Sequence, residues 1–510
     1  MIAKVKSCAL SGLDGYLVTA EVDAYAGVPA IDIVGLPDAA VKESRERVRS
    51  AVRNSGLQFP QKKIIVNLAP ADTKKEGAYL DLAITVAILV SSGQMEQRAA
   101  EPYVFIGELA LDGALRPAAG VLPMVLEAKK CGVARAIVPA ENAPEAAVVD
   151  GVEVYGAHSL SEAAAHLRGE RPLAKERVDL SGFFGGGTAL HEDFADVKGQ
   201  EGAKRALEVA AAGAHNCLMI GAPGSGKTML ARRLPGILPD LTFDEALEVT
   251  KIYSIAGKLP PGTALIKERP FRSPHHGVSG AALTAGGSPP RPGEICLAHR
   301  GVLFLDEFPE FRKDAMEAMR QPLEDGQFTV ARAGGTVTFP SACMLVASMN
   351  PCRCGYYGDP VRECTCTPGQ IQKYLSKISG PMLDRVDIHI EVPTVRFADL
   401  AQQRKAECSA DIKRRVNAAR EIQLKRYQRD GIFANAQLDA AGIEQYCAIG
   451  DDGRALLARV FETLGLSARA HARILKVART IADLAGSEDI LVPHLAEAIQ
   501  YRSLDKKFFR

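Results

Sequence analysis

Eight consecutive residues have the types and spacing of a phosphate-binding loop: Gly221, Ala222, Pro223, Gly224, Ser225, Gly226, Lys227 and Thr228. The loop follows the apolar run "NCLMI" and precedes a helical pattern, so it lies between a strand and a helix. Its glycines let backbone N–H groups surround a polyphosphate. Lys227 can neutralise the β and γ phosphates, and the Thr228 hydroxyl can bind Mg²⁺. The pattern predicts an ATP site.

Two carboxylates and an asparagine follow two further apolar strands. The run "VLFL" at 302–305 ends in Asp306 and Glu307, and "ACMLVASM" ends in Asn350. We expect Asp306 to hold Mg²⁺ through water and Glu307 to orient or deprotonate the attacking water. Asn350 is suited to positioning that water or the γ-phosphate, although an Asn-Pro pair is also a common turn. With the phosphate loop, these residues predict ATP hydrolysis.

Four cysteines in the pattern C-x-C-x9-C-x-C flank a loop rich in Gly, Asp and Pro: Cys352, Cys354, Cys364 and Cys366. Four thiolates suit tetrahedral Zn²⁺, although C-x-C is tighter than the usual C-x2-C knuckle. The alternatives are four reduced thiols or a labile redox pair. Bound zinc would have a structural role in the loop 351–367.

A β-hairpin is predicted in "LEDGQFTVARAGGTVTF", residues 323–339. Phe328 and Val330 alternate with polar residues before the turn, and Val337 and Phe339 do so after it. Arg332 lies near the tip. By itself the pattern is compatible with a surface hairpin whose arginine is merely solvated.

The elements that must position these residues form an α/β pattern followed by an all-helical one. Strand-like runs at 16–24, 63–70, 103–111 and 135–140 alternate with helical runs up to about residue 168. A polar stretch with Gly185, Gly186 and Gly187 reads as a linker. From about 195 to 395 strands and helices alternate again, with a strand-poor interruption at 256–295. After Pro393 only helical patterns remain.

The composition excludes few functions. A chain of 510 residues is too long for one core, and 62 Lys+Arg against 61 Asp+Glu leave no global field for a nucleic acid or a membrane. We find no signal peptide and no apolar stretch of membrane-spanning length. The expected location is cytoplasmic, without a membrane partner, where the 11 cysteines would be thiols or metal ligands.

The order of phosphate loop, Asp306-Glu307 strand and Asn350 strand resembles the AAA+ ATPases. On this resemblance, "SGPMLDRVDI" at 379–388 matches the arginine-finger segment, with Arg385 acting in a neighbouring subunit's site. "SARAHARILKVA" resembles the sensor-2 helix, with Arg469 as the matching arginine. A solvated arginine on an amphipathic helix is the alternative for both. An arginine supplied by a neighbour implies a ring, usually of six subunits.

The hairpin and the interruption at 256–295 resemble the pre-sensor-1 hairpin and the helix-2 insert of one AAA+ clade, which includes the MCM helicases and the magnesium-chelatase I subunit. This resemblance implies that the hairpin points into the pore of the ring and contacts DNA. The arginines that would face DNA phosphates are Arg332, Arg269, Arg272 and Arg291. His275 and His276 of "SPHHG" are DNA contacts or loop residues without an assigned role, and nothing makes them metal ligands.

The N-terminal part resembles the proteolytic domain of the Lon family, which uses a Ser–Lys dyad. The position of the nucleophile is occupied by Tyr79 and that of the lysine by Leu122, so we expect no peptidase activity. A scaffold or an added DNA-binding ring fits such a domain. Four lysines would give it some basic surface: Lys62, Lys63, Lys74 and Lys75.

Over almost its whole length the chain resembles the magnesium-chelatase-like family of AAA+ ATPases. The most specific parts of the match are "RPFRSPHH", "NPCRCGYYGD" and "SGPMLDR". The family implies a hexameric, ATP-driven helicase that migrates branched DNA during homologous recombination of transforming DNA. Implied partners are single-stranded and branched DNA, with a recombinase as a candidate. The rivals are an ATPase subunit for magnesium insertion into a porphyrin, a non-motor DNA clamp and an ATP-dependent protease.

The expected domains follow from these resemblances: a Lon-like domain at 1–168, a linker at 169–194, an AAA+ core at 195–395 and a helical lid at 396–510.

Overall fold

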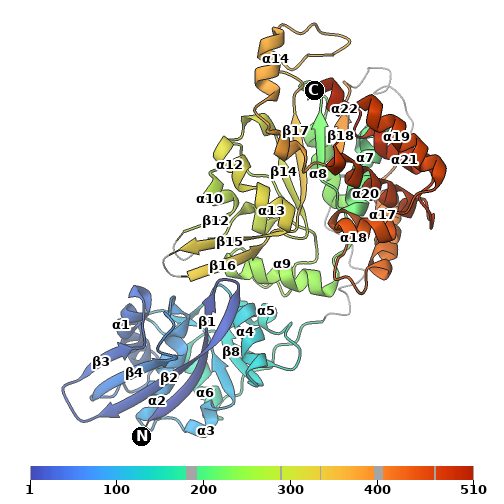
Figure 1. Cartoon of the computed structure of the whole chain (residues 1–510). Helices are drawn as coiled ribbons and strands as arrows, with labels where there is room; N and C mark the ends of the chain where they lie inside the picture. Colours follow the sequence, from blue (N-terminus) through green and yellow to red (C-terminus); the bar gives the residue numbers. More distant parts are fainter. Residues whose placement is uncertain are drawn as a thin grey trace.

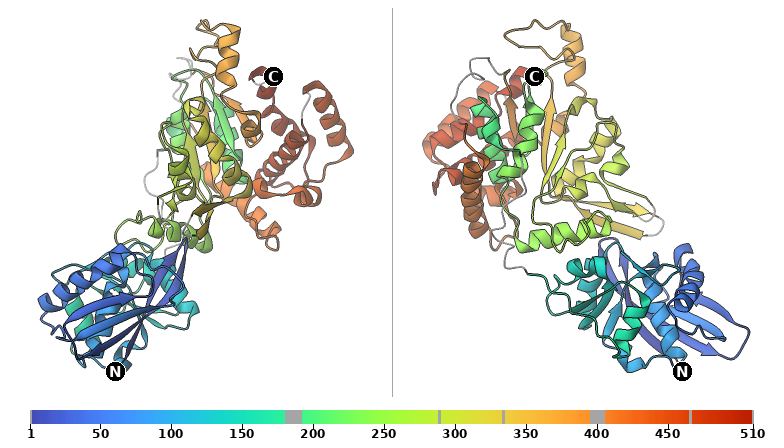
Figure 2. Two further views of the ribbon diagram at one scale, coloured as in Figure 1. Left: turned by 60° about the vertical axis from the view of Figure 1, so that its left-hand side comes forward. Right: turned by 180° about the vertical axis from the view of Figure 1, so that it is seen from behind.

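The computed structural model shows an N-terminal α/β region joined to a larger region in which a parallel sheet is flanked by helices (Figures 1 and 2). It describes residues 2–179, 192–287, 290–332, 335–394, 406–464 and 467–508. The glycine triplet of the predicted linker lies outside these residues. No helix in the described ranges combines the length and apolarity that a bilayer crossing requires. The predicted mixed α/β fold class is confirmed.

A seven-stranded sheet forms the N-terminal region, in the order β3-β4-β2-β1-β5-β8-β9. The sheet is mixed, because β1 pairs antiparallel with β2 and parallel with β5. Its strands are β1 (Ala3–Ser11), β2 (Asp14–Tyr25), β3 (Ala30–Val34), β4 (Lys63–Ala69), β5 (Tyr103–Phe105), β8 (Arg135–Pro139) and β9 (Glu153–Ala157).

Alternate residues of β1 face two cores, as the two-residue period of a strand requires. Val5 and Ala9 pack with α1 (Ala39–Asn54), α2 (Asp81–Ser91) and α6 (Leu160–Leu167). Cys8 points the other way and packs with α4 (Val121–Lys130) and α5 (Ala143–Ala146). Helices therefore cover both faces of this sheet.

The larger region contains a five-stranded parallel sheet in the order β11-β14-β17-β10-β18. The central strands are buried along their whole length, which is typical of parallel sheets covered on both faces. The strands are β10 (Cys217–Ile220), β11 (Phe271–Arg272), β14 (Val302–Leu305), β17 (Met344–Met349) and β18 (Ile388–Glu391).

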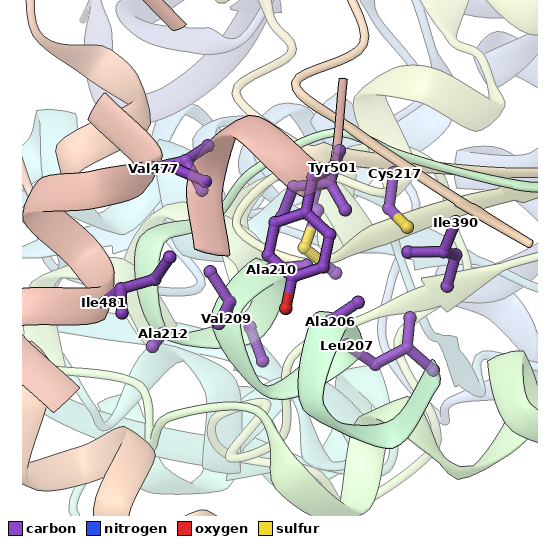
Figure 3. Packing of buried hydrophobic residues seen from close by; sticks show 14 of the residues in the cluster. Ala206, Leu207, Val209, Ala210, Ala212, Cys217, Ile390, Val477, Ile481 and Tyr501 are labelled. Atoms are coloured by element: carbon purple, nitrogen blue, oxygen red, sulfur yellow. The ribbon is translucent and has the colours of Figure 1, made fainter. Parts of the chain in front are cut away.

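One face of this sheet packs on α7 (Glu201–Gly213) and on helices from the C-terminal part of the chain (Figure 3). Ala210 and Val209 of α7 lie in the same cluster as Ile481 of α20 (Ala468–Leu484) and Tyr501. The C-terminal helices thus share a core with the sheet. They also include α17 (Ser409–Arg426), α18 (Ala440–Tyr446), α19 (Asp451–Leu464), α21 (Val492–Gln500) and α22 (Leu504–Phe508).

The opposite face packs on the predicted hairpin and on the strand-poor segment. The hairpin is present as β15 (Gln327–Arg332) and β16 (Gly335–Pro340), paired antiparallel. Phe328 and Phe339 stack at a centroid distance of 5.6 Å and lie in this core. The strand-poor segment contains three two-residue strands, β11, β12 (Ala285–Gly286) and β13 (Arg291–Pro292), with the short helices α10 (Gly280–Leu283) and α11 (Glu294–Leu297).

The N-terminal region meets the larger one through the β1–β2 turn and α4, which lie beside the hairpin and α9 (Phe243–Ile255) (Figure 1). The Gly120 amide donates to the Ser254 carbonyl at 3.0 Å, and Lys251 forms an ion pair with Asp14. A Cβ atom on Gly12 would lie 2.6 Å from the Val337 side chain, so the turn approaches β16 as closely as a glycine allows.

Candidate ATP site

The phosphate loop joins β10 to α8 (Lys227–Arg233), as its flanking pattern predicts. Gly224 and Gly226 have φ values of +77° and +92°, in the left-handed region that favours glycine. A Cβ atom on Gly221 would lie 2.4 Å from the Val392 carbonyl oxygen. The loop conformation therefore requires glycine at these three positions.

The Lys227 ammonium group is held inside the loop. It donates to the carbonyl oxygens of Gly221 at 2.7 Å and Ala222 at 3.0 Å, and to Asn350 Oδ1 at 3.2 Å. Burial lowers the pKa of Lys227 to about 8, against the opposing charges of Asp306 and Glu307. The structure thus brings the predicted lysine and asparagine together across two neighbouring strands.

Asp306 lies directly beyond the end of β14. Its carboxylate accepts hydrogen bonds from the Thr228 hydroxyl at 2.8 Å and from the Ser348 hydroxyl. Thr228 and Asp306 place two hard oxygen ligands side by side, which suits Mg²⁺. Our sequence reasoning missed Ser348, although the two-residue strand period places it on the same face as Asn350.

Glu307 adopts a left-handed backbone conformation, with φ of +53°. This region is uncommon for a residue other than glycine, and such residues cluster at functional sites. The Glu307 side chain is 60% exposed, and its Oε2 atom lies 3.6 Å from His276 Nδ1. We did not anticipate this contact from the sequence.

Residues of the phosphate loop and of the strand ends line one cavity of about 430 Å³, within the usual range for a small-molecule site. Pro223, Lys227 and Thr228 form one wall, and Asp306, Glu307, Ser348 and Asn350 form the other. The cavity lies at the carboxyl ends of the parallel strands, the usual ligand position in open α/β sheets.

Arg385 and Arg469 lie at the other edge of the sheet. They line a cavity of about 480 Å³ together with residues that precede the strands, such as Asn216 before β10 and Asp387 before β18. The four residues of β10 separate the two edges by about 13 Å at a rise of ~3.3 Å per residue. Neither arginine lines the cavity at the phosphate loop of its own chain.

The two arginines differ in how firmly they are held. Arg385 forms an ion pair with Glu324 and donates to the carbonyl oxygens of Arg320 at 3.2 Å and Pro381 at 2.6 Å. Burial and three nearby arginines lower the pKa of Arg385. Arg469 is 65% exposed and pairs with Asp384 at 3.3 Å.

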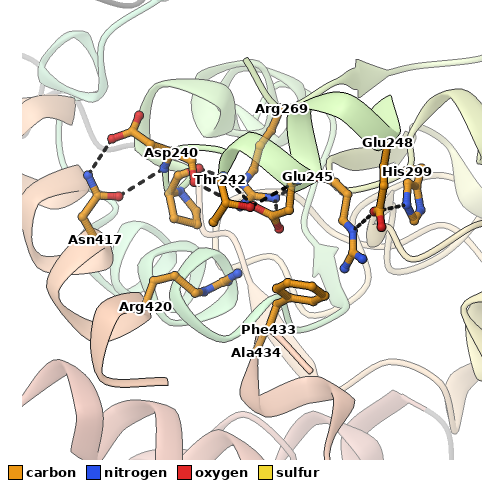
Figure 4. Close-up of polar contacts among 12 residues, drawn as sticks. Asp240, Thr242, Glu245, Glu248, Arg269, His299, Asn417, Arg420, Phe433 and Ala434 are labelled. Carbon is orange, nitrogen blue, oxygen red and sulfur yellow. Dashed lines mark hydrogen bonds and ion pairs between the residues drawn. The ribbon is translucent and has the colours of Figure 1, made fainter. Parts of the chain in front are cut away.

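The predicted DNA contact at Arg269 is corrected by the structure (Figure 4). Its side chain is 8% exposed and forms an ion pair with Glu245 at 2.7 Å. It also donates to the carbonyl oxygens of Pro239 and Arg300, both at 2.7 Å. Arg269 therefore ties α9 to the start of β14, and its guanidinium group does not face outward.

The other predicted DNA contacts have three different placements. Arg272 forms a two-pronged ion pair with Glu294, at 2.7 and 2.9 Å, and is 30% exposed. Arg291 is exposed on β13. Arg332 is the last residue of β15 and lies at the hairpin turn. Its backbone is described by the structure, and its side chain is not.

The four cysteine thiols of the 351–367 loop converge. Their Sγ atoms all lie within 4.8 Å of one another, with Cys352 to Cys354 at 3.3 Å and Cys352 to Cys364 at 3.6 Å. Gly355 lies against the phosphate loop, since a Cβ atom there would be 2.5 Å from Pro223 Cδ. The cysteine cluster thus adjoins the candidate ATP site.

The two positions at which the Lon family carries its Ser–Lys dyad belong to the N-terminal region. The Tyr79 hydroxyl accepts a hydrogen bond from the Leu10 amide at 3.3 Å, and Leu122 is fully buried. The expectation that Lys75 adds basic surface is wrong, because Lys75 is 0% exposed and its ammonium group donates to the Thr73 carbonyl.

Comparison with known protein families matches three models to successive parts of the chain. "Subunit ChlI of Mg-chelatase" matches residues 20–142, "Magnesium chelatase, subunit ChlI" matches 193–400, and "Magnesium chelatase, subunit ChlI C-terminal" matches 406–502.

Individual relatives match over different lengths. The chain is 44% identical to competence protein ComM of Haemophilus influenzae, over 99% of this chain and 98% of the relative. It is equally similar to the uncharacterized protein YifB of Escherichia coli, at 44% over 98% and 97%. The chloroplastic magnesium-chelatase subunit ChlI of rice is 26% identical over 55% of this chain and 67% of the relative. The chain therefore belongs to the magnesium-chelatase-like family that includes ComM and YifB.

Proposed function

We propose that the protein is a Mg²⁺-dependent ATPase that moves DNA. The observation that carries the ATPase proposal is the pairing of Thr228 with Asp306 beside Lys227, at the carboxyl ends of the strands. Thr228 and Asp306 would hold Mg²⁺, which neutralises phosphate charge when bound. Lys227 would bind the β and γ phosphates, Asn350 would orient the γ-phosphate or the water, and Glu307 would accept the proton of that water.

The active form in this proposal is a ring, with six subunits as in the AAA+ proteins that the chain resembles. Hydrolysis of this kind requires a positive charge near the γ-phosphate. Arg385 and Arg469 lie at the opposite edge of the sheet from the phosphate loop of their own chain. In a ring they could reach the nucleotide site of a neighbouring subunit. The C-terminal helices would serve as the lid that carries Arg469.

The proposed substrate is branched DNA, and the proposed role is branch migration during recombination of transforming DNA. Support comes from the 44% identity to competence protein ComM along the whole chain and from the hairpin between β14 and β17. Arg332 at the hairpin turn and Arg291 on β13 are the proposed phosphate contacts. A recombinase remains the candidate protein partner.

A three-stranded branched DNA substrate tests the motor proposal. With ATP and Mg²⁺ the wild-type protein should displace a strand, and Glu307→Gln should bind the same DNA without displacing it. An Arg332→Ala variant should keep its basal ATPase and lose DNA-stimulated turnover. If Glu307→Gln supports every DNA-dependent effect of the wild type, the protein is a clamp and the motor proposal fails.

We further propose that the N-terminal region is a Lon-like domain without peptidase activity. Tyr79 and Leu122 offer no nucleophile with an adjacent base. Leu122 is fully buried, and Tyr79 is half-buried against the two cores of the N-terminal region. Hydrolysis of unfolded protein by the purified chain, sensitive to Tyr79→Phe, would contradict this assignment.

The four cysteines are proposed to bind one Zn²⁺ per chain. A tetrahedral site with Zn–S bonds of about 2.3 Å has S–S edges of about 3.8 Å. The Sγ–Sγ distances among Cys352, Cys354 and Cys364 are 3.3 to 3.6 Å, and Cys366 Sγ lies within 4.8 Å of all three. Metal analysis should find about one zinc per chain, lost in a Cys352→Ser/Cys366→Ser variant. A metal-free wild-type protein would favour reduced thiols.

A further inference from the structure

We propose that His276 is a positioning residue for Glu307: its imidazole donates to one carboxylate oxygen and leaves the other oxygen free to face the attacking water. This inference rests on the proposed ATPase function and assigns a role to a residue outside the phosphate loop and the strand ends. The contact joins His276 Nδ1 and Glu307 Oε2 at 3.6 Å. This separation exceeds hydrogen-bond distance, so the proposed donation requires the two side chains to approach by about 0.5 Å.

Glu307 needs such a partner because, among the residues that the structure describes, its carboxylate is held less firmly than that of Asp306. Its side chain is 60% exposed, whereas the carboxylate of Asp306 is held by two hydroxyl groups. An exposed glutamate samples several rotamers, and fixing it costs free energy. A group that orients attacking water must be held within a narrow range of geometry, since a displacement of about 1 Å can cost ~100-fold in rate.

His276 is well placed to supply that restraint because its ring contacts two other rings. The ring centroids of His275 and His276 are 4.0 Å apart, and those of His276 and Phe311 are 6.4 Å apart with an interplanar angle of 77°. Phe311 is 4% exposed and belongs to the core beneath the sheet. The imidazole is 39% exposed and has one buried neighbour, Phe311, against which it can be held.

The backbone around His276 is also anchored at both ends. Upstream, β11 pairs in parallel with β14, the strand that ends at Asp306. Downstream, the Ser279 hydroxyl caps α10 by accepting from the Ala282 amide. Between them the amides of Gly277 and Val278 donate back to His275. Parallel pairing of β11 with β14 therefore brings the His276 turn beside Glu307.

The experiment is a comparison of three variants at His276 by steady-state ATPase kinetics. Ala removes both the ring and the donor. Phe keeps the ring that packs against His275 and Phe311 but has no N–H group. Asn loses the ring but carries an amide donor at the same number of bonds from Cβ as Nδ1.

We expect His276→Ala and His276→Phe to lower kcat by about ten-fold with KM for ATP unchanged. His276→Asn should retain most of the wild-type kcat. A purely structural role predicts the reverse order, with Phe more active than Asn. That order, or wild-type kcat in the Ala and Phe variants, would overturn the proposal.

A second measurement keeps the proposal separate from the ATPase assignment. Glu307→Gln should abolish turnover while binding ATP, and adding His276→Ala to it should leave ATP affinity unchanged. If Glu307→Gln hydrolyses ATP at the wild-type rate, the assigned role of Glu307 fails. If Glu307→Gln is inactive while His276→Ala and His276→Phe are fully active, only the role of His276 fails.

Discussion

The two edges of the five-stranded sheet contrast in what they hold. The edge at the carboxyl ends of the strands carries the glycine loop, Lys227, Asp306 and Asn350, and no described residue that lines this cavity is an arginine. The edge at the amino ends carries Arg385, Arg469 and Arg473, held by carboxylates of the same chain. In the proposed ATPase, one chain would thus contain both halves of the site but place them on opposite sides of the sheet. This separation is the strongest structural argument for assembly.

The largest expected effect comes from removing the lysine at the carboxyl edge and the arginine at the amino edge, one at a time. Lys227→Ala should abolish nucleotide binding, and Arg385→Ala should keep binding but lose about 1,000-fold in turnover. Mixing the two inactive variants should restore part of the activity, because a Lys227→Ala subunit can donate its Arg385 to an intact phosphate loop. ATPase assays on titrated mixtures measure this.

The complementation has a clear opposite outcome. If mixtures stay inactive at every ratio while light scattering shows mixed assemblies, the edges do not cooperate between subunits. Robust hydrolysis by dilute, monomeric Arg385→Ala protein would equally contradict the comparison.

A second prediction compares a buried arginine with an exposed one, both in the strand-poor segment 256–295. Arg269→Met should destabilise the fold by about 3 kcal/mol, because it leaves the buried Glu245 without its partner. Arg291→Ala should leave stability unchanged. It should reduce the slope of log K for DNA binding against log salt concentration by roughly 0.7 to 0.9 per lost phosphate contact. Urea unfolding and DNA titrations at several salt concentrations test the pair. Equal stability of both variants would contradict the buried placement of Arg269.

A third prediction concerns Asp387 at the amino edge. Burial would raise its pKa, but the His215 imidazole, whose Nδ1 lies 3.4 Å from Asp387 Oδ2, and the charge of Arg473 outweigh burial and lower the pKa to about 2. Because the folded pKa lies below the unfolded value, the carboxylate stabilises the fold above about pH 4. That contribution is lost as pH falls toward 2.

Asp387→Asn should therefore cost about 2 kcal/mol at neutral pH, with the difference from wild type shrinking below pH 4. Unfolding curves between pH 3 and 7 measure this. A difference that is constant across the range would show that the charge of Asp387 is not the stabilising factor.

The smallest expected effect is on stability at Arg469. Its side chain is 65% exposed, and exposed ion pairs contribute at most about 1 kcal/mol. Arg469→Ala should leave the melting temperature nearly unchanged while lowering ATPase turnover. A variant that loses stability without losing turnover would identify Arg469 as a structural residue. That result would weaken the proposal that the arginines at the amino edge act in ATP hydrolysis.

Strands β10, β14 and β17 and the hairpin were predictable because their patterns are local. Apolar runs of four to eight residues bounded by glycines or carboxylates indicate buried strands, and alternation on both sides of a glycine turn indicates a hairpin. The strands β1, β3 and β9 were not recognised. β3 shows why, since its residues are all exposed or half-buried and its pairing with β4 is decided by the sheet.

Residue chemistry alone determined the phosphate loop and the paired carboxylates and made the four cysteines candidate zinc ligands, because these depend on short spacings along the chain. Only the tertiary structure decided that Arg269 is buried in an ion pair, that Lys75 faces inward and that His276 meets Glu307. A side chain's surroundings depend on segments distant in sequence. An arginine or histidine pattern looks the same whether an acidic partner from another strand lies beside it or not.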